Sequence, residues 1–159
     1  MTHITIEYMI MIPILIMQIF LFPLTTSWLM NIWVDSRRTL ALQEATSHLG
    51  STIQQLYFAL NHETISAGTA TYSPGLPPFI EDYNYIGNAT LRKVSASADS
   101  SKVLSITLTL TKTKIIVTTL VILGPNVLWR PSVFISNSTS AIVSAEKLSN
   151  GTIRLYFGG

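Results

Sequence analysis

The sequence predicts an α+β protein in which one long helix, hydrophobic at first and then amphipathic, precedes an antiparallel β-sandwich or barrel-like head. Three observations predict this class. An almost uncharged apolar run extends from Tyr8 to Val34, an amphipathic pattern of helical period continues to about Asn61, and short alternating segments punctuated by Gly and Pro follow. We therefore expect a helical stalk over residues 1–62 and a β-rich head over residues 63–159.

The apolar run exceeds the roughly 20 residues that an α-helix needs to cross a bilayer core. Such a segment requires lipid or an equally dry protein environment. A cleavable secretory peptide has a basic front and an apolar run of only about 7 to 15 residues, whereas the first Lys or Arg here is Arg37. We expect residues 1–34 to be retained as a membrane segment or filament core. Pro13 and Pro23 are expected to kink or locally unwind it, because proline lacks an N–H donor.

Beyond Asp35 the helical pattern becomes one-sided. Its apolar residues recur at intervals of two to four, at Leu40, Leu42, Ala45, Leu49, Ile53, Leu56, Tyr57 and Leu60. This spacing is typical of a helix that buries one face, so residues 35–62 are expected to be amphipathic. Gly50 is a candidate bend, and the helix is expected to end between Asn61 and Thr64. The entire helix would be roughly 85 Å long at about 1.5 Å per residue.

The remaining residues predict short strands. The segment from Ser73 to Pro78 carries three prolines and is expected to form a loop, with the strands beginning after it. The clearest strand is 104–111, where Leu and Ile alternate with Ser and Thr. Other expected strands are 79–86, 89–96, 115–123, 127–135 and a final hairpin of 141–148 with 153–157. Asn150-Gly151 is expected to join this hairpin, because that dipeptide readily supplies two positive φ angles.

Composition argues against several classes of function. The ten basic residues give a net charge of only +2 and are scattered from Arg37 to Arg154, so nucleic acid is not an expected partner. The chain has no Cys, which removes disulfides, thiolate catalysis and zinc–thiolate clusters. Glu44 and His48 stand four residues apart, but two ligands without a third do not predict a metal site. No phosphate loop or nucleophile elbow is present, and we expect neither an enzyme nor a cofactor.

The second half of the chain carries three Asn-X-Ser/Thr sequons, at Asn88, Asn137 and Asn150. They are candidate N-glycosylation sites and favour exposure outside the cell. Because the chain is rich in Ser and Thr, chance occurrence of these sequons is an equally good interpretation.

Aromatic residues gather in two places. In the apolar run we expect them to pack in a bundle, with Trp28 and Trp33 as interfacial anchors. A second set surrounds the proline-rich loop and consists of Tyr72, Phe79, Tyr83 and Tyr85. We expect this set to cover the junction between stalk and head, the alternative being an exposed binding patch.

The residues from Ile4 to Met11 read Ile-Thr-Ile-Glu-Tyr-Met-Ile-Met and lead directly into the apolar run. This arrangement resembles the start of type IV pilins, especially archaeal ones. A common archaeal pattern has Gln, any residue, Ser, any residue, Glu, three residues and Leu. The matching positions here are His3, Thr5, Glu7 and Met11, so only the Glu is identical. The resemblance covers about the first 60 residues and the general layout of a β head. Archaellins, the related subunits of the archaeal swimming filament, commonly lack this Glu, so Glu7 favours a pilin.

The resemblance implies a homopolymer of identical subunits, reached through a stage in the membrane. It implies that a prepilin peptidase removes a basic leader, with cleavage just before His3 in the family's usual spacing. An assembly ATPase and a platform protein are further implied partners. The expected assembly residues are Glu7, Tyr8, Pro13 and Pro23. A carboxylate in a dry bundle is costly, and an amine on a neighbouring subunit would offset that cost. The alternative is that Glu7 reaches water at the interfacial end of a membrane helix.

These observations lead us to expect a structural subunit of an extracellular archaeal type IV pilus-like filament that serves adhesion or motility. One alternative is a single-pass membrane protein whose β domain is an adhesin or ligand-binding module that does not polymerise. Arg37 and Arg38 directly follow the span and, by the positive-inside rule, place the head in the cytoplasm, which counts against an external head. A second alternative is an archaellin.

Overall fold

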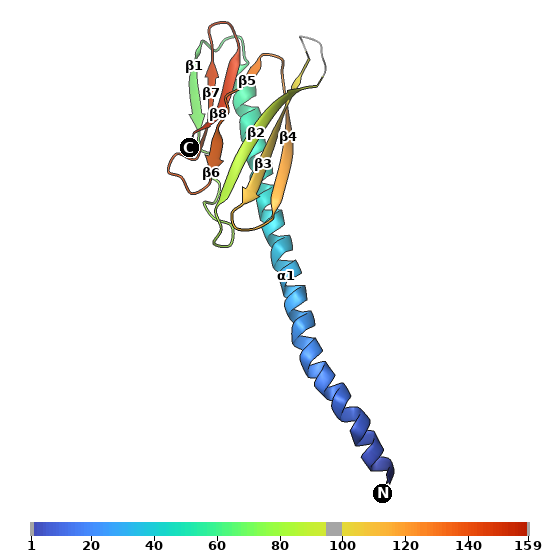
Figure 1. Ribbon diagram of the computed structural model, residues 1–159. Coiled ribbons are helices and arrows are strands. Elements are labelled where there is room, and N and C mark those ends of the chain that lie inside the picture. Colours follow the sequence, from blue (N-terminus) through green and yellow to red (C-terminus); the bar gives the residue numbers. More distant parts are fainter. Residues whose placement is uncertain (1, 95–99, 159) are drawn as a thin grey trace. The chain divides into compact units, whose positions relative to one another are not determined.

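The computed structural model describes residues 2–94 and 100–158, with side chains from residue 9 onward. One long helix, α1 (Thr2–Leu60), is followed by two β-sheets, which confirms the predicted α+β class (Figure 1). The strands are β1 (Gly68–Tyr72), β2 (Tyr85–Lys93), β3 (Lys102–Leu110), β4 (Ile116–Leu123), β5 (Val127–Trp129), β6 (Val133–Ile135), β7 (Ile142–Lys147) and β8 (Ile153–Gly158).

The chain divides into two compact units within α1, one of residues 1–37 and one of residues 38–159. The second unit therefore contains the last part of the helix together with all the described strands. The predicted division after residue 62 follows the end of the helix instead, and it stays a prediction about domain organisation.

The strands form two four-stranded sheets, ordered β1-β7-β8-β5 and β4-β3-β2-β6. Pairing is antiparallel except between β5 and β8, which run parallel. The predicted strand at 104–111 is β3, which pairs with β2 from Tyr85 opposite Leu110 to Lys93 opposite Lys102. The predicted final hairpin is formed by β7 and β8. The expectation of two positive φ angles in its turn is wrong: Gly151 has a φ of 79° but Asn150 does not have a positive φ.

The strand predictions are wrong at three points. β1 precedes the proline-rich loop, and its mostly exposed Gly-Thr-Ala-Thr-Tyr sequence shows no clear alternation. The predicted strands 79–86 and 89–96 are joined in the single strand β2, which confirms 89–93 as strand, while residues 95 and 96 lie outside the described residues. Residues 79–84 are not a strand, because Glu81 and Asp82 adopt positive φ angles in a tight turn that closes with an Ile80–Tyr83 bridge. The predicted strand 127–135 is split between the two sheets. Pro131 lies at this break. It has no N–H to donate to a neighbouring strand, so it interrupts the pairing.

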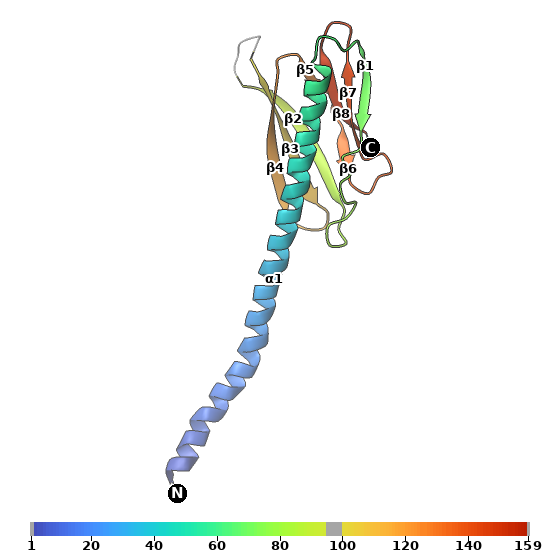
Figure 2. The same ribbon diagram turned by 180° about the vertical axis from the view of Figure 1, so that it is seen from behind.

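The core of the second unit is built from alternating strand residues and one stripe of α1. On β3, the inward side chains Leu104, Ile106, Leu108 and Leu110 are completely buried. On α1 the buried stripe consists of Leu42, Ala45, Leu49, Ile53, Tyr57 and Leu60. Figure 2 shows this part of α1, coloured cyan to green, running along β2 and β3. The stripe has the predicted helical spacing, and each of its members belongs to the same hydrophobic cluster as the strands.

The details of α1 differ from the sequence-based expectation at four points. Leu40 is 63% exposed and lies outside the buried stripe. The helix ends at Leu60, one residue before the predicted range. It also continues through Pro13 and Pro23, so the expected unwinding is absent from the described helix. Gly50 makes no break; a Cβ there would lie 3.0 Å from Val121 Cγ2, so Gly50 lets the helix approach β4 closely.

Candidate assembly surface

The apolar side chains of α1 from Met9 to Trp33 are exposed on every side of the helix. In the described residues, eighteen large hydrophobic side chains of this segment are between 49% and 77% exposed. The described part of the chain contains one helix long and apolar enough to cross a membrane, found between Met9 and Leu60, and none of its most apolar window is buried. We call residues 9–34 the apolar segment. Its surface is the principal candidate site.

Both prolines of the apolar segment leave a backbone carbonyl without its usual helical donor. In an α-helix the N–H of residue i donates to the carbonyl of residue i−4, and proline has no N–H. Pro23 therefore frees the carbonyl of Ile19, and Pro13 frees that of Met9. The prolines thus change the hydrogen-bonding capacity of the surface although α1 remains helical at both positions.

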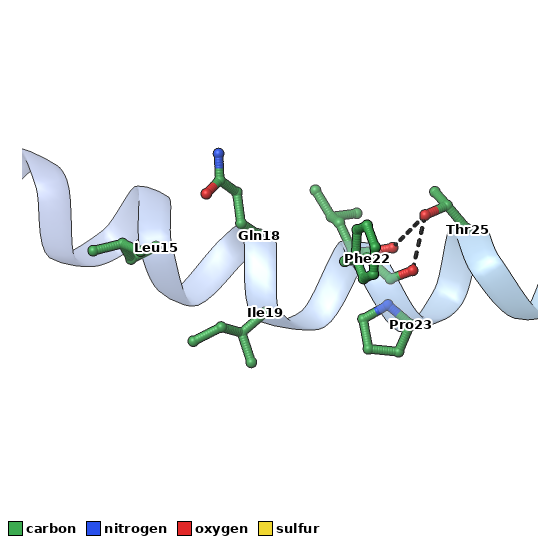
Figure 3. Close-up of a pocket in the computed structure, with 7 residues that line it drawn as sticks. Leu15, Gln18, Ile19, Phe22, Pro23 and Thr25 are labelled. Atoms are coloured by element: carbon green, nitrogen blue, oxygen red, sulfur yellow. Dashed lines mark hydrogen bonds between the residues drawn. The ribbon is translucent and has the colours of Figure 1, made fainter.

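The two threonine hydroxyls of the segment are satisfied within the helix, whereas Ser27 has no hydrogen-bond partner among the described residues. Thr25 Oγ1 donates to the carbonyls of Leu21 and Phe22, at 3.1 and 2.9 Å, as Figure 3 shows. Thr26 Oγ1 donates to the Phe22 carbonyl at 2.8 Å. These bonds reach carbonyls other than that of Ile19, so they do not replace the donor that Pro23 lacks.

Gln18 differs from these threonines. Its side chain is exposed and has no hydrogen-bond partner among the described residues. It borders a shallow groove on the helix that is also lined by Leu15, Ile19, Leu21, Phe22, Pro23 and Thr25 (Figure 3). Gln18 is not among the assembly residues expected from the sequence. The signal that could have found it is a carboxamide in the middle of an apolar run, five residues before a proline.

The predicted assembly residues are spread along the start of α1. Pro13 and Pro23 lie in the apolar segment. Glu7 and Tyr8 belong to the helix, but their side chains lie outside the described residues. A role for the Glu7 carboxylate therefore stays a prediction.

Two arginines, Arg37 and Arg38, mark the boundary between the two units. The Arg37 guanidinium stacks over the Trp33 ring, 4.9 Å from its centroid. Arg38 Nε lies 2.8 Å from Glu81 Oε2, and its guanidinium is 5.1 Å from the centroid of Tyr83. Arg38 is thus anchored to the head by an ion pair and an aromatic contact, whereas Arg37 places a cation over Trp33 at the end of the apolar segment.

The structure separates the four aromatic residues around the proline-rich loop. Tyr72 and Phe79 are each 51% exposed, while Tyr83 is half-buried beneath Arg38. Tyr85 is fully buried, and its hydroxyl donates to the Pro77 carbonyl at 2.7 Å. Burial raises the pKa of Tyr85 to about 12. Tyr85 is therefore a core residue of the head.

The three predicted glycosylation sites are exposed but lie in different backbone settings. Asn88 is in the middle of β2, opposite Thr107 of β3 and Val133 of β6. Asn137 follows β6 in a turn. Asn150 lies in the turn between β7 and β8, where its Oδ1 accepts a hydrogen bond from the Thr152 N–H at 3.0 Å. Modification at any of them stays a prediction.

Glu44 and His48 also lie on the exposed side of α1, where they border a cleft with Leu76, Pro77 and Ile80. Within the described ranges, no group of three or more metal-ligating side chains surrounds them.

Comparison of the chain with protein-family models, with curated proteins and with solved structures gave no match.

Proposed function

We propose that this protein is a structural subunit of an extracellular archaeal type IV pilus-like filament, whose core consists of packed copies of the apolar segment. The head would face outward and serve adhesion or motility. In this proposal the segment is held in the cytoplasmic membrane before assembly, and the partners are identical subunits together with a prepilin peptidase, an assembly ATPase and a platform protein.

One observation carries the proposal: the apolar segment is exposed on all sides, although the head has a core of its own. Burying a large apolar side chain contributes about 1.5–3 kcal/mol. Because the eighteen large side chains of this segment are 49–77% exposed, leaving that part of them uncovered represents a cost of the order of 15–30 kcal/mol in water. A helix that is apolar all round must be covered all round. Parallel copies of the same helix supply that cover in a filament.

The resemblance of the amino terminus adds a second line of support. Glu7 directly precedes the apolar run, at the position of the carboxylate in the archaeal pilin pattern. A carboxylate at the entrance to a dry bundle requires an opposite charge, and the amino terminus of a neighbouring subunit would provide one. A pairing of this kind would fix the register between subunits.

A second candidate function is that of a membrane-anchored head that does not polymerise. The observation that favours it is the group formed by Trp28, Trp33 and Arg37 at the end of the segment. Trp is enriched at membrane interfaces, and Arg37 stacks on Trp33 there. Lipid tails cover an apolar helix as well as neighbouring helices do, so apolar burial alone does not choose between these functions.

The decisive test uses native cells. Cells are sheared, and the released material is viewed by negative-stain electron microscopy with an antibody against the head. In parallel, the native protein is sequenced from its amino terminus. The proposal predicts labelled thin fibres and a terminus at or near His3. Recovery of the protein solely as a monomer in the membrane fraction would favour the anchored head.

A further inference from the structure

Of the polar side chains in the apolar segment that have no hydrogen-bond partner among the described residues, Gln18 lies nearest mid-span, and Ser27 and Asn31 lie closer to Asp35. Gln18 lies 11 residues after Glu7 and 17 residues before Asp35, which corresponds to about 16 Å and 25 Å along a helix. Its carboxamide has no hydrogen-bond partner among the described residues. An amide moved into a medium without hydrogen bonds costs about 4–8 kcal/mol. Gln18 therefore needs a partner that its own described helix does not supply.

The same segment contains one unpaired acceptor at the same depth. Pro23 leaves the carbonyl of Ile19 without its helical donor, and the hydroxyls of Thr25 and Thr26 bond to other carbonyls. The other freed carbonyl, that of Met9, lies only two residues from Glu7 and so close to the polar front. Each copy of the chain thus presents a carboxamide, which supplies N–H donors, and a freed backbone carbonyl, which accepts, deep in the apolar segment.

We propose that the Gln18 carboxamide of one subunit donates a hydrogen bond to the Ile19 carbonyl of the next subunit. This inference rests on the proposed function and names a polar contact that selects a second copy over lipid. Lipid tails offer no hydrogen-bond partner at this depth, whereas a second copy offers the matching one. Apolar burial is similar in lipid and in a bundle, so a polar pair of this kind favours the bundle.

The positions of donor and acceptor favour an open chain of subunits. The freed Ile19 carbonyl faces the position of Pro23, which follows Gln18 by five residues. At 3.6 residues per turn, that spacing places the donor and the acceptor roughly 140° apart around the helix. In the view of Figure 3, Gln18 and Pro23 point to opposite sides. Two copies that face each other through one surface cannot form both bonds. Each subunit instead gives Gln18 to one neighbour and receives Gln18 from another, a heterologous contact that propagates into a filament.

The contact also predicts the axial shift between neighbours. Helical side chains lean toward the amino terminus, whereas the carbonyl points toward the carboxyl terminus. The donor helix must therefore be displaced along the axis toward its carboxyl end by about one turn, roughly 5–8 Å, to bring Gln18 Nε2 level with the Ile19 oxygen.

The test compares four variants in the native host: Gln18→Leu, Pro23→Ala, the double variant, and Thr26→Val as control. The readout is the ratio of subunit in sheared filaments to subunit in the membrane, measured with an antibody against the head. Gln18→Leu is expected to lower this ratio about five- to thirtyfold, the range for an interhelical hydrogen bond of 1–2 kcal/mol. Pro23→Ala is expected to lower it similarly, because the restored N–H occupies the Ile19 carbonyl.

The double variant should lose no more than the more affected single variant, because both changes remove the same bond. Thr26→Val should leave the ratio unchanged, since its hydroxyl bonds within its own helix. If wild-type filaments form and Gln18→Leu leaves the ratio unchanged, or if the two losses multiply, the Gln18 contact is wrong and the proposed function stands. If the wild-type chain forms no filaments, the proposed function itself fails.

Discussion

The two parts of α1 share one backbone but have opposite relations to their surroundings. In residues 9–34 the large apolar side chains are exposed around the whole circumference. In residues 38–60 most apolar side chains form one buried stripe, while Leu40 and Phe58 are exposed and polar residues occupy most of the remaining surface. The change occurs at Arg37 and Arg38, where the chain divides into its two compact units.

One part of the helix therefore completes the fold of the head, whereas the other presents an apolar surface that its own chain does not cover among the described residues. The second part is completed by strands of its own chain, so its apolar residues stabilise the monomer. The first part has no such partner among the described residues, so its apolar residues contribute only when lipid or other subunits cover them. Substitutions in the two parts should therefore affect different properties.

Truncation should show the largest difference between the two parts of α1 in their effect on folding of the head. A fragment of residues 38–159 keeps all the described core and is expected to be soluble and cooperatively folded. A fragment of residues 61–159 lacks Leu42, Leu49 and Ile53, which are fully buried, and is expected not to fold. Circular dichroism with urea titration measures both. A folded 61–159 fragment would show that the helix is dispensable for the head.

Matched Leu→Ala changes should give the next largest difference. Leu49 is completely buried, so Leu49→Ala should lower the free energy of unfolding of the head by about 2–5 kcal/mol through lost burial and the cavity left behind. Leu29 is 59% exposed, and Leu29→Ala should leave that free energy within about 0.5 kcal/mol. Chemical denaturation in detergent, followed by the head's near-ultraviolet signal, provides the comparison. Equal losses would contradict the division of roles.

The buried phenol of Tyr85 predicts how the head responds to alkali. Its pKa is about 12 in the folded state against 10 for an ordinary tyrosine, so the folded state favours the neutral form. The associated stability is fully present below pH 10 and is lost as the pH rises from 10 to 12. At about 1.4 kcal/mol per pKa unit, the loss reaches up to about 3 kcal/mol.

The control for this response is Tyr85→Phe. It should cost about 1 kcal/mol at neutral pH, because the bond to the Pro77 carbonyl is lost. It should also remove the loss of stability that Tyr85 causes between pH 10 and 12, since no phenol remains at this position to ionise. Unfolding midpoints from pH 7 to 12 measure the difference. Parallel pH profiles for the two proteins would mean that Tyr85 ionises without unfolding the head.

The smallest effect is expected at Gly50, where α1 approaches β4. A Cβ at this position would lie 3.0 Å from Val121 Cγ2 and 3.2 Å from Thr119 Cγ2. Gly50→Val should therefore destabilise the head by about 1–3 kcal/mol through overpacking. Ser51→Val, at the next and exposed position, is a control for introducing a β-branched residue into this turn of the helix. If Gly50→Val and Ser51→Val unfold at the same denaturant concentration, the close approach has no energetic consequence.

Much of the fold follows from local sequence, and the parts that do not are set by pairing between distant segments. The buried stripe on α1 and the alternation of β3 repeat at the period of their own element, so the sequence displays them directly. β1 has no such signal and is a strand because β7 pairs with it. The separation of β5 and β6 into different sheets and the parallel pairing of β5 with β8 also depend on partners far along the chain.

The candidate assembly surface likewise has one part that the sequence predicts and one part that it does not. The exposed apolar segment was predictable because its length and lack of charge exceed what a monomeric core helix uses. The importance of Gln18 was not predictable from periodicity, since it depends on which hydroxyls already satisfy which carbonyls. Thr25 and Thr26 look equally polar in the sequence, yet their hydroxyls bond to their own helix.

Cross-linking around one turn of the apolar segment tests the central claim most directly. The chain has no Cys, so single cysteines at Ile19, Phe20, Leu21 and Phe22 sample the whole circumference without background. We predict that, in sheared native material treated with a short bis-maleimide, all four positions give cross-links between subunits, because copies cover the helix on every side. Cross-links confined to one face, or none at any position, would contradict this account, because lipid would then cover the faces without cross-links.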